Sequence, residues 1–164
     1  MATITLRGNE VHTEGTLPSI GQEAPLFTLT KKDLSSFSLS ELKGKKVIIN
    51  ITPSLDTGIC AATARKFNEQ ATQLNAVVLQ VTKDLPFAQA RFCEAEGIEN
   101  VITLADYKNS DFADAYHTLI KDGPMAGLHS RAIIVINEEG KVVYTEQVPE
   151  IAQEPDYEKA IAAL

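Results

Sequence analysis

Short apolar runs alternate with longer segments of helical periodicity along this chain of 164 residues. Runs of β-branched and aliphatic residues bounded by turn residues predict strands. We expect these strands at 46–51, 76–82, 101–104, 132–136 and 142–148. Segments with apolar residues three and four positions apart predict helices. We expect the helices at 60–74, 86–97, 111–119 and 154–164.

Turn residues predict two hairpins, one near each end of the chain. Ile4 and Leu6 alternate with polar residues, and Gly8-Asn9 is expected to turn the chain into a second short strand. Near the other end, residues 137–140 read Asn-Glu-Glu-Gly and separate two predicted strands. Prolines and glycine predict an extended or turning path over 17–29, and Ser40 is expected to cap a short turn.

The order of these elements predicts an α/β fold with a central mixed sheet flanked by helices. The sheet is mixed because helix-connected strands run parallel and the last hairpin must be antiparallel. A thioredoxin-like fold with an added N-terminal β-hairpin fits this order. No linker or repeat interrupts the chain, so we expect a single domain over 1–164, with 1–16 as the hairpin extension.

The composition is that of a folded protein and excludes several function classes. Apolar residues make up 44% and charged residues 23% of the chain, which argues against disorder. The net charge of −7 argues against a nucleic-acid binder, which needs a basic face. Residues 1–10 have no apolar core of a signal peptide, and no run approaches a membrane span of about 20 residues. The expected location is therefore the cytoplasm, with no membrane partner.

The chain contains only two cysteines, Cys60 and Cys93. They are too few for a disulfide scaffold. Together with His12, His117 and His129 they show no zinc-ligand spacing, so no metal site is expected. In a reducing compartment, a cysteine pair is more typical of catalysis or redox sensing than of structure.

Cys60 lies where a buried strand gives way to a helix. The unpaired backbone N–H groups of a first helical turn stabilise a thiolate, and Thr57 can place a hydroxyl beside it. Pro53 restricts the backbone after the strand. The alternative is that Cys60 is a small buried residue and that 56–58 only cap the helix.

This segment resembles the peroxiredoxin signature Pro-x-x-x-Thr-x-x-Cys, met by Pro53, Thr57 and Cys60. Longer strings across the whole chain are similar to the bacterial thiol peroxidase (Tpx) subfamily of peroxiredoxins. They begin at Thr52, Asp84, Asp122, Arg131 and Glu154. The subfamily often has Phe where Thr52 stands, which changes packing and leaves the catalytic positions intact.

The resemblance implies an atypical 2-Cys peroxidase. Cys60 would be the peroxidatic and Cys93 the resolving cysteine of an intramolecular disulfide, with Thr57, Arg131 and Pro53 completing the peroxide site. It further implies hydrogen peroxide and alkyl hydroperoxides as substrates, thioredoxin as reductant and a homodimer. No metal, flavin or haem is implied. From its position alone, Arg131 would be a solvent-facing charge at a strand start.

An ionised thiol alone does not explain a fast peroxidase. At an ordinary pKa near 8.5, about 3% of a thiol is ionised at pH 7. Lowering the pKa to near 5.5 requires roughly 4 kcal/mol of stabilisation of the thiolate. A helix N-terminus supplies only about 0.3–1 kcal/mol, so a nearby cation is also required, and Arg131 is the candidate. Nucleophilicity falls as the pKa falls and nearly cancels the gain in thiolate. We therefore expect Thr57 and Arg131 to stabilise the transition state, as oxyanion-hole donors do.

Cys93 belongs to the helix that Pro86 opens. Leu85, Ala88, Phe92 and Ala95 are expected to form its apolar stripe, with Cys93 beside them. The alternative for Cys93 is a small core residue. A sulfenic acid at Cys60 needs a thiol to avoid further oxidation, which favours a resolving role. Because a disulfide requires Cα atoms within about 7 Å, we expect local unwinding of one or both helices.

Three other function classes are alternatives to a peroxidase. In a non-enzymatic redox switch, the same disulfide would change the binding of a partner, and no catalytic turnover with thioredoxin would occur. A disulfide reductase is disfavoured because the chain has no Cys-x-x-Cys. A Cys–His hydrolase would need His117 or His129 beside a cysteine, and no third orienting group is identifiable.

Overall fold

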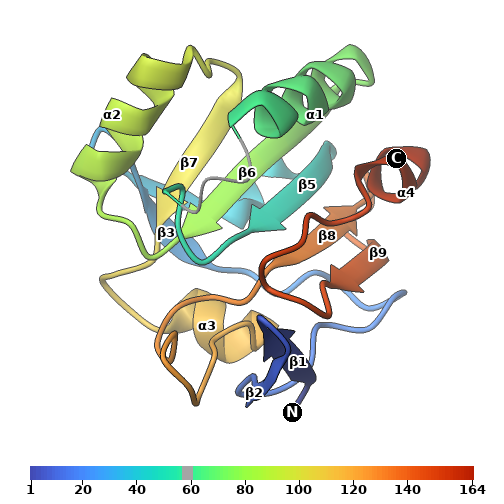
Figure 1. The fold of residues 1–164 in the computed structure, drawn as a ribbon. Helices are drawn as coiled ribbons and strands as arrows, with labels where there is room; N and C mark the ends of the chain where they lie inside the picture. Colours follow the sequence, from blue (N-terminus) through green and yellow to red (C-terminus); the bar gives the residue numbers. More distant parts are fainter. Residues whose placement is uncertain (57–60) are drawn as a thin grey trace.

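The computed structural model describes residues 1–56 and 61–164, with the backbone alone at 61–64. A seven-stranded sheet runs through the centre in the order β4-β3-β7-β6-β5-β8-β9 (Figure 1). β5, β6 and β7 are parallel, whereas β8 pairs antiparallel with β5 and β3 pairs antiparallel with β7. The strands are β3 (Thr28–Lys31), β4 (Ser36–Ser38), β5 (Lys46–Ile51), β6 (Ala76–Thr82), β7 (Val101–Ala105), β8 (Ala132–Ile136) and β9 (Val142–Gln147). The predicted α/β fold with a mixed, thioredoxin-like sheet is confirmed.

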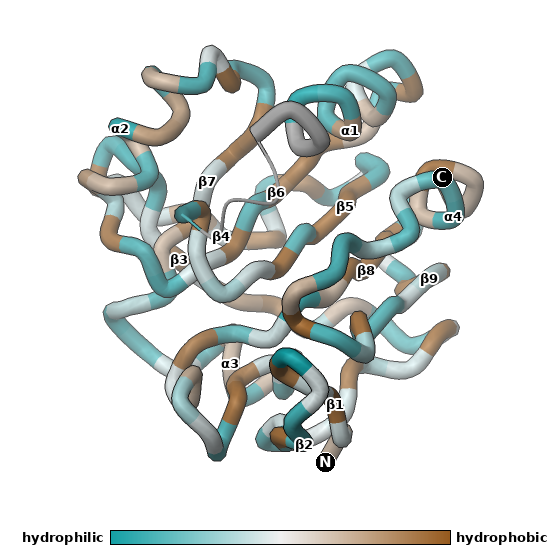
Figure 2. Tube along the Cα trace, viewed as in Figure 1, coloured by the Kyte–Doolittle hydropathy of each residue, from teal (hydrophilic) through white to brown (hydrophobic). Residues whose placement is uncertain are grey.

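Helices cover both faces of this sheet (Figure 1). The four α-helices are α1 (Ala61–Gln73), α2 (Pro86–Glu96), α3 (Asp111–Tyr116) and α4 (Tyr157–Ala162). Alternate residues of β5 face opposite sides. Ile48 packs with Phe67 of α1 and Ala160 of α4, whereas Val47, Ile49 and Ile51 pack on the side of α3. Figure 2 shows the hydrophobic residues gathered along the central strands. Burial on both faces explains why these strands are continuous apolar runs.

The N-terminal hairpin consists of β1 (Thr3–Leu6) and β2 (Asn9–His12). Leu6 pairs with Asn9, so the turn is Arg7-Gly8, one residue earlier than the predicted Gly8-Asn9. Both turn residues have positive φ, which matches the twist of a two-residue hairpin. The carboxylate of Glu150 accepts hydrogen bonds from the Thr5 hydroxyl and from the N–H groups of Arg7 and Gly8. These bonds lower the pKa of Glu150 to about 2.

Several element ends differ from the predictions. The hairpin β3–β4 was not predicted, because its strands are short and partly polar. The short turn is a 3-10 helix, η1 (Leu39–Leu42), capped by Ser38 and Glu41, not by Ser40. α3 ends early because His117 adopts a left-handed φ of 58°. α4 begins at Tyr157, because the Asp156 side chain caps it by accepting the Lys159 N–H.

Candidate active site

Arg131, directly before β8, is buried with 1% of its surface exposed. Its Nε donates to the Ile151 carbonyl at 2.8 Å, and its own carbonyl accepts from Val148 N–H and Gln147 Nε2. The solvent-facing alternative for this residue is therefore wrong. A buried guanidinium is costly unless polar groups surround it, and the Ile151 carbonyl is one such group here.

Arg131 and Cys93 line one small cavity of about 30 Å³. This volume is roughly twice the minimum that holds a water molecule, so it is on the scale of a small peroxide. Thr52, Ser54 and Leu55, from the segment that follows β5, line the same cavity. The structure thus brings together Arg131, Cys93 and the residues that flank Pro53.

Buried polar side chains from the strands form another part of the cavity wall. Asn50 Nδ2 donates to Gln80 Oε1 at 3.0 Å, and Gln80 Nε2 donates to Thr52 Oγ1 at 3.1 Å. Thr103 of β7 lies in the same wall. These residues were not predicted as part of the site. The available signal was a polar residue at an inward position of each predicted buried strand, where an apolar residue is usual.

Cys93 is a free thiol on the buried face of α2. Burial raises the pKa of this thiol, while the positive charge of Lys32 and the Thr103 hydroxyl oppose the rise. At neutral pH, Cys93 is therefore a thiol and a weak nucleophile in this arrangement. It also lines an open hollow of about 740 Å³, which Lys32 and Glu94 share.

The predicted apolar stripe of α2 is wrong. Of its four residues, Leu85 and Ala95 are exposed and Ala88 and Phe92 are half-buried, whereas the buried face consists of Pro86, Gln89 and Cys93. Gln89 is held inward because its amide donates to the Thr82 hydroxyl and to the Leu104 carbonyl. The burial of Gln89 is therefore stabilised by hydrogen bonds and not by apolar contact.

Two of the predicted site residues, Thr57 and Cys60, lie outside the described residues. Pro53 is buried in the turn that precedes them. This turn is held by Asp84, whose carboxylate accepts the Ser54 hydroxyl at 2.8 Å and the Leu55 N–H at 2.7 Å. The backbone of α1 begins at Ala61, as expected for a helix that starts beside Cys60.

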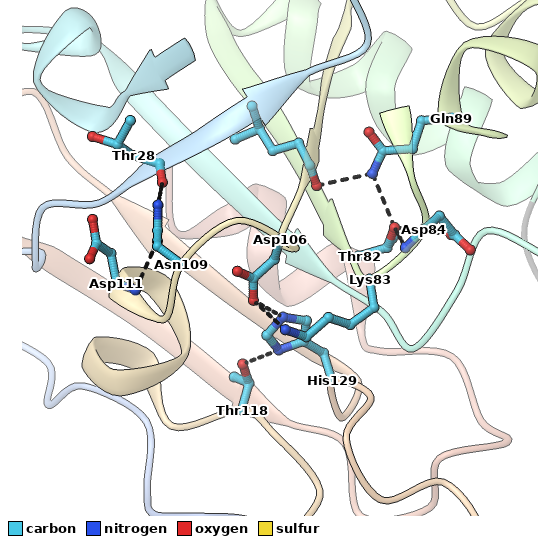
Figure 3. Close-up of polar contacts among 11 residues, drawn as sticks. Thr28, Thr82, Lys83, Asp84, Gln89, Asp106, Asn109, Asp111, Thr118 and His129 are labelled. Carbon is cyan, nitrogen blue, oxygen red and sulfur yellow. Dashed lines mark hydrogen bonds and ion pairs between the residues drawn. The ribbon is translucent and has the colours of Figure 1, made fainter. Parts of the chain in front are cut away.

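A second polar cluster contains His129, Asp106, Thr118 and Lys83 (Figure 3). His129 Nε2 lies 2.7 Å from Asp106 Oδ2, and its Nδ1 lies 2.8 Å from the Thr118 hydroxyl. Burial lowers the pKa of His129, so its neutral ring donates to Asp106 and accepts from Thr118. Burial alone would raise the pKa of Asp106, but the bond to His129 and the charge of Lys83 lower it. His129 thus has orienting groups that the sequence did not reveal, and its ring nitrogens are engaged away from Cys93.

Within the described ranges, no group of His, Cys, Asp and Glu side chains is arranged to hold a metal ion. In the same part of the chain, no helix has the length and apolar character of a membrane span.

Comparisons with known proteins identify the family and the fold of this chain. The profile of the family described as "Redoxin" matches residues 19–161. Proteins called thiol peroxidase from Mycobacterium bovis and Mycobacterium tuberculosis are 56% identical over 164 residues, which is all of this chain and 99% of theirs. The crystal structure of a peroxiredoxin-like protein from Aquifex aeolicus is 38% identical and superposes with a TM-score of 0.90 over 98% of this chain and 94% of its own. A solved thiol peroxidase from Chromobacterium violaceum is 21% identical, with a TM-score of 0.87 over 96% of this chain and 91% of its own, and shares the fold.

Proposed function

This chain belongs to the redoxin family and is a peroxiredoxin of the thiol peroxidase type, and we propose that it works by an intramolecular 2-Cys cycle. The Cys60 thiolate attacks one peroxide oxygen, the O–O bond breaks, and the alkoxide or hydroxide takes a proton to leave as alcohol or water. Cys60 becomes a sulfenic acid. Cys93 loses its thiol proton and attacks the Cys60 sulfur, the S–O bond breaks, and the departing hydroxide takes up a proton and leaves as water, which forms the disulfide. Thioredoxin supplies two electrons and two protons to restore both thiols.

The observation that carries this proposal is the shared cavity of Cys93 and Arg131. A free thiol and a buried guanidinium line one small space together with Ser54 and Leu55, which lead toward Thr57 and Cys60. No sequence proximity requires this, since Cys93 and Arg131 come from different elements. The juxtaposition supports a thiol near the attack site and a cation beside the reacting oxygens.

Arg131 and Thr57 are assigned to the transition state. Negative charge moves from sulfur to the departing oxygen as the O–O bond breaks. Fixed donors at that oxygen stabilise the transition state without reorganising. The Nε bond of Arg131 to the Ile151 carbonyl supports this role, because it fixes the guanidinium plane. Pro53, buried in the preceding turn, shields the site from water.

The substrates we assign are hydrogen peroxide and alkyl hydroperoxides. The cavity volume suits the peroxide group itself. Leu55 and Phe92, both half-buried, give its wall an apolar side against which an alkyl chain can pack.

The open hollow of about 740 Å³ that Cys93 also lines supports reduction by a protein dithiol, because a bulky partner needs an open surface beside the sulfur. We assign this role to thioredoxin, and we place the reaction in the cytoplasm, where thioredoxin keeps thiols reduced. We further propose a homodimer, as the family resemblance implies, with its mass measured by light scattering.

The test is peroxide turnover with thioredoxin, using Cys60→Ser and Cys93→Ser. We expect Cys60→Ser to be inactive. Cys93→Ser should consume one equivalent of peroxide, form a sulfenic acid trapped by dimedone, and then stop. Turnover by Cys60→Ser would contradict the assignment of the nucleophile. Sustained turnover by Cys93→Ser with thioredoxin would contradict the resolving role.

A further inference from the structure

Asp84 follows β6 and its carboxylate holds the segment that leads to Cys60. Oδ1 accepts the Ser54 hydroxyl at 2.8 Å, and Oδ2 accepts the Leu55 N–H at 2.7 Å. Ser54 in turn accepts the Asp56 N–H at 3.1 Å. Residues 54–56 are therefore organised around one carboxylate, immediately before the predicted peroxidatic segment.

The same carboxylate is bonded to Thr82, whose hydroxyl is saturated. That hydroxyl donates to Asp84 Oδ2 at 3.0 Å and accepts the Asp84 N–H at 3.0 Å. It also accepts from Gln89 Nε2 at 3.1 Å. A hydroxyl has one hydrogen and two lone pairs, so every position on Thr82 is used. Figure 3 shows Asp84, Thr82 and Gln89 joined in this way.

Gln89 extends the connection to the helix of Cys93. Its amide also donates to the Leu104 carbonyl at 3.0 Å, which ties α2 to β7. Gln89 and Cys93 are four positions apart and lie on the same buried face of α2. A continuous series of hydrogen bonds thus runs from the loop before Cys60 to the helix that carries Cys93.

We propose that Asp84 is a positioning residue for the peroxidase reaction, which holds residues 54–55 for attack on peroxide and, through Thr82 and Gln89, tethers the helix of Cys93. This rests on the proposed function, because it assigns the two cysteines to successive steps. These hydrogen bonds should raise the rate of attack on peroxide, because the nucleophile must be fixed relative to the groups that donate to the departing oxygen. The same bonds should slow disulfide formation, because at least one helix must move to bring the Cα atoms of Cys60 and Cys93 within about 7 Å.

Three substitutions separate these two effects. Asp84→Ala removes every bond that the carboxylate accepts. Asp84→Asn is the conservative variant, because its oxygen keeps the bonds from Leu55 and Thr82 and its amide donates to Ser54 Oγ. Gln89→Met keeps the side-chain length and removes both donors to Thr82 and Leu104, so it releases the helix alone.

The matched control is Asp122→Ala. The Asp122 carboxylate accepts the His12 N–H at 2.8 Å and lies 2.7 Å from His12 Nδ1, so it fastens a loop to the N-terminal hairpin. This control removes two contacts of a carboxylate, against three in Asp84→Ala, and neither Asp122 nor His12 lines the cavity. It measures how the loss of a carboxylate that is hydrogen-bonded elsewhere in the fold affects Cys60 oxidation and disulfide formation.

The readout is a rapid-quench experiment on the reduced chain with hydrogen peroxide, analysed by mass spectrometry because the chain has no tryptophan. The first phase is oxidation of Cys60 and the second is the disulfide. We expect Asp84→Ala to slow the first phase about tenfold or more, since bonds to a charged group are lost, and to leave the second no slower. Asp84→Asn should stay within about threefold of wild type in both phases. Gln89→Met should speed the second phase and keep the first, and Asp122→Ala should change neither.

Wild-type oxidation rate in Asp84→Ala, or equal slowing of both phases, would overturn the positioning role. If disulfide formation in Gln89→Met is no faster than in wild type, the proposal that Gln89 restrains the helix of Cys93 is wrong. If Asp84→Ala does not fold, Gln89→Met and Asp84→Asn decide, because loss of the first phase in Asp84→Asn with its bonds retained contradicts the proposal. Failure of the proposed function is a separate result, in which wild type itself forms no intramolecular disulfide.

Discussion

Arg131 and Cys93 are both buried in the wall of one cavity, and burial acts on them in opposite ways. The electrostatic field of the guanidinium is stronger in a buried site than in water. The thiol loses reactivity, because burial raises the pKa of Cys93. A resolving cysteine that is unreactive in the reduced protein avoids attacking other disulfides before Cys60 has been oxidised.

Arg131→Ala tests the transition-state role at the level of one side chain. We expect the rate constant with hydrogen peroxide to fall about 10²–10³-fold, the usual loss when one donor to a developing oxyanion is removed. Arg131→Lys keeps the charge and loses the fixed plane, so its loss should be intermediate. The Cys60 pKa of each variant is measured by the pH dependence of alkylation. A rate loss fully accounted for by the thiolate fraction would contradict this role.

At the scale of elements, α2 shows what hydrophobic pattern does and does not predict. Its ends follow local rules, because Pro86 opens it and Gly97 closes it with a left-handed φ of 63°. Its buried face does not follow the apolar pattern, since Gln89 is buried and Phe87 is exposed. The helix is joined to α1 by the exposed pair Arg65–Glu96, which contributes little because water screens it. The Gln89 bonds are therefore the stronger restraint on this helix.

Disulfide formation should unwind part of α1 or α2. We expect amide hydrogens near Cys93, near Cys60 or near both to exchange faster in the oxidised chain than in the reduced chain, because a disulfide requires Cα atoms within about 7 Å and we expect the two cysteines to belong to separate helices. Exchange is measured by mass spectrometry on both forms, with β5 and β8 as internal controls. A disulfide that forms with unchanged exchange near both cysteines would refute local unwinding.

The sequence carried enough information for the sheet and too little for the polar parts of the site. The apolar runs of β5, β6 and β8 are buried on both faces, so their pattern is unambiguous. Asn50 and Gln80 were not found, because a polar residue in a strand has meaning only once its cross-strand partner is known. The resemblance alone implied a site role for Arg131, and its burial was not predicted, since its Ile151 partner is 20 positions away.

In the molecule as a whole, the cluster of His129, Asp106 and Lys83 connects the carboxyl ends of β6 and β7 with the amino end of β8. Asp106 follows β7, Lys83 follows β6, and His129 lies just before β8. The cluster thus joins the edge of the sheet where the cavity lies. Because His129 is neutral and Asp106 is ionised when buried there, both groups resist protonation in the folded state.

Acid should therefore destabilise the fold through this cluster. The pKa of His129 is lower folded than unfolded, so the unfolded chain binds more protons below about pH 6.5 and unfolding becomes easier. The slope from one such proton is about 1.4 kcal/mol per pH unit. The pKa of Asp106 is also lowered in the fold, so its protonation reduces the free energy of unfolding further at pH values below about 4.

His12 acts in the opposite direction, because its bond to Asp122 raises its pKa and stabilises the fold at low pH. A comparison with His129→Gln isolates the cluster, since His12 is common to both chains. Urea unfolding between pH 5 and pH 7 measures the slopes. We expect a smaller loss of stability on acidification in His129→Gln than in wild type; equal slopes would show that His129 takes up its proton in the fold.

In the proposed cycle, Cys60 and Cys93 form one reversible disulfide in each turnover. Intact mass and peptide mapping of the reduced chain, after one equivalent of hydrogen peroxide, test this most directly. We predict a chain that has lost two hydrogen atoms, a peptide that links Cys60 to Cys93, and return to the original mass after thioredoxin is added. A monomer that gains oxygen at Cys60 while Cys93 stays a free thiol, or a disulfide between two chains, would contradict it.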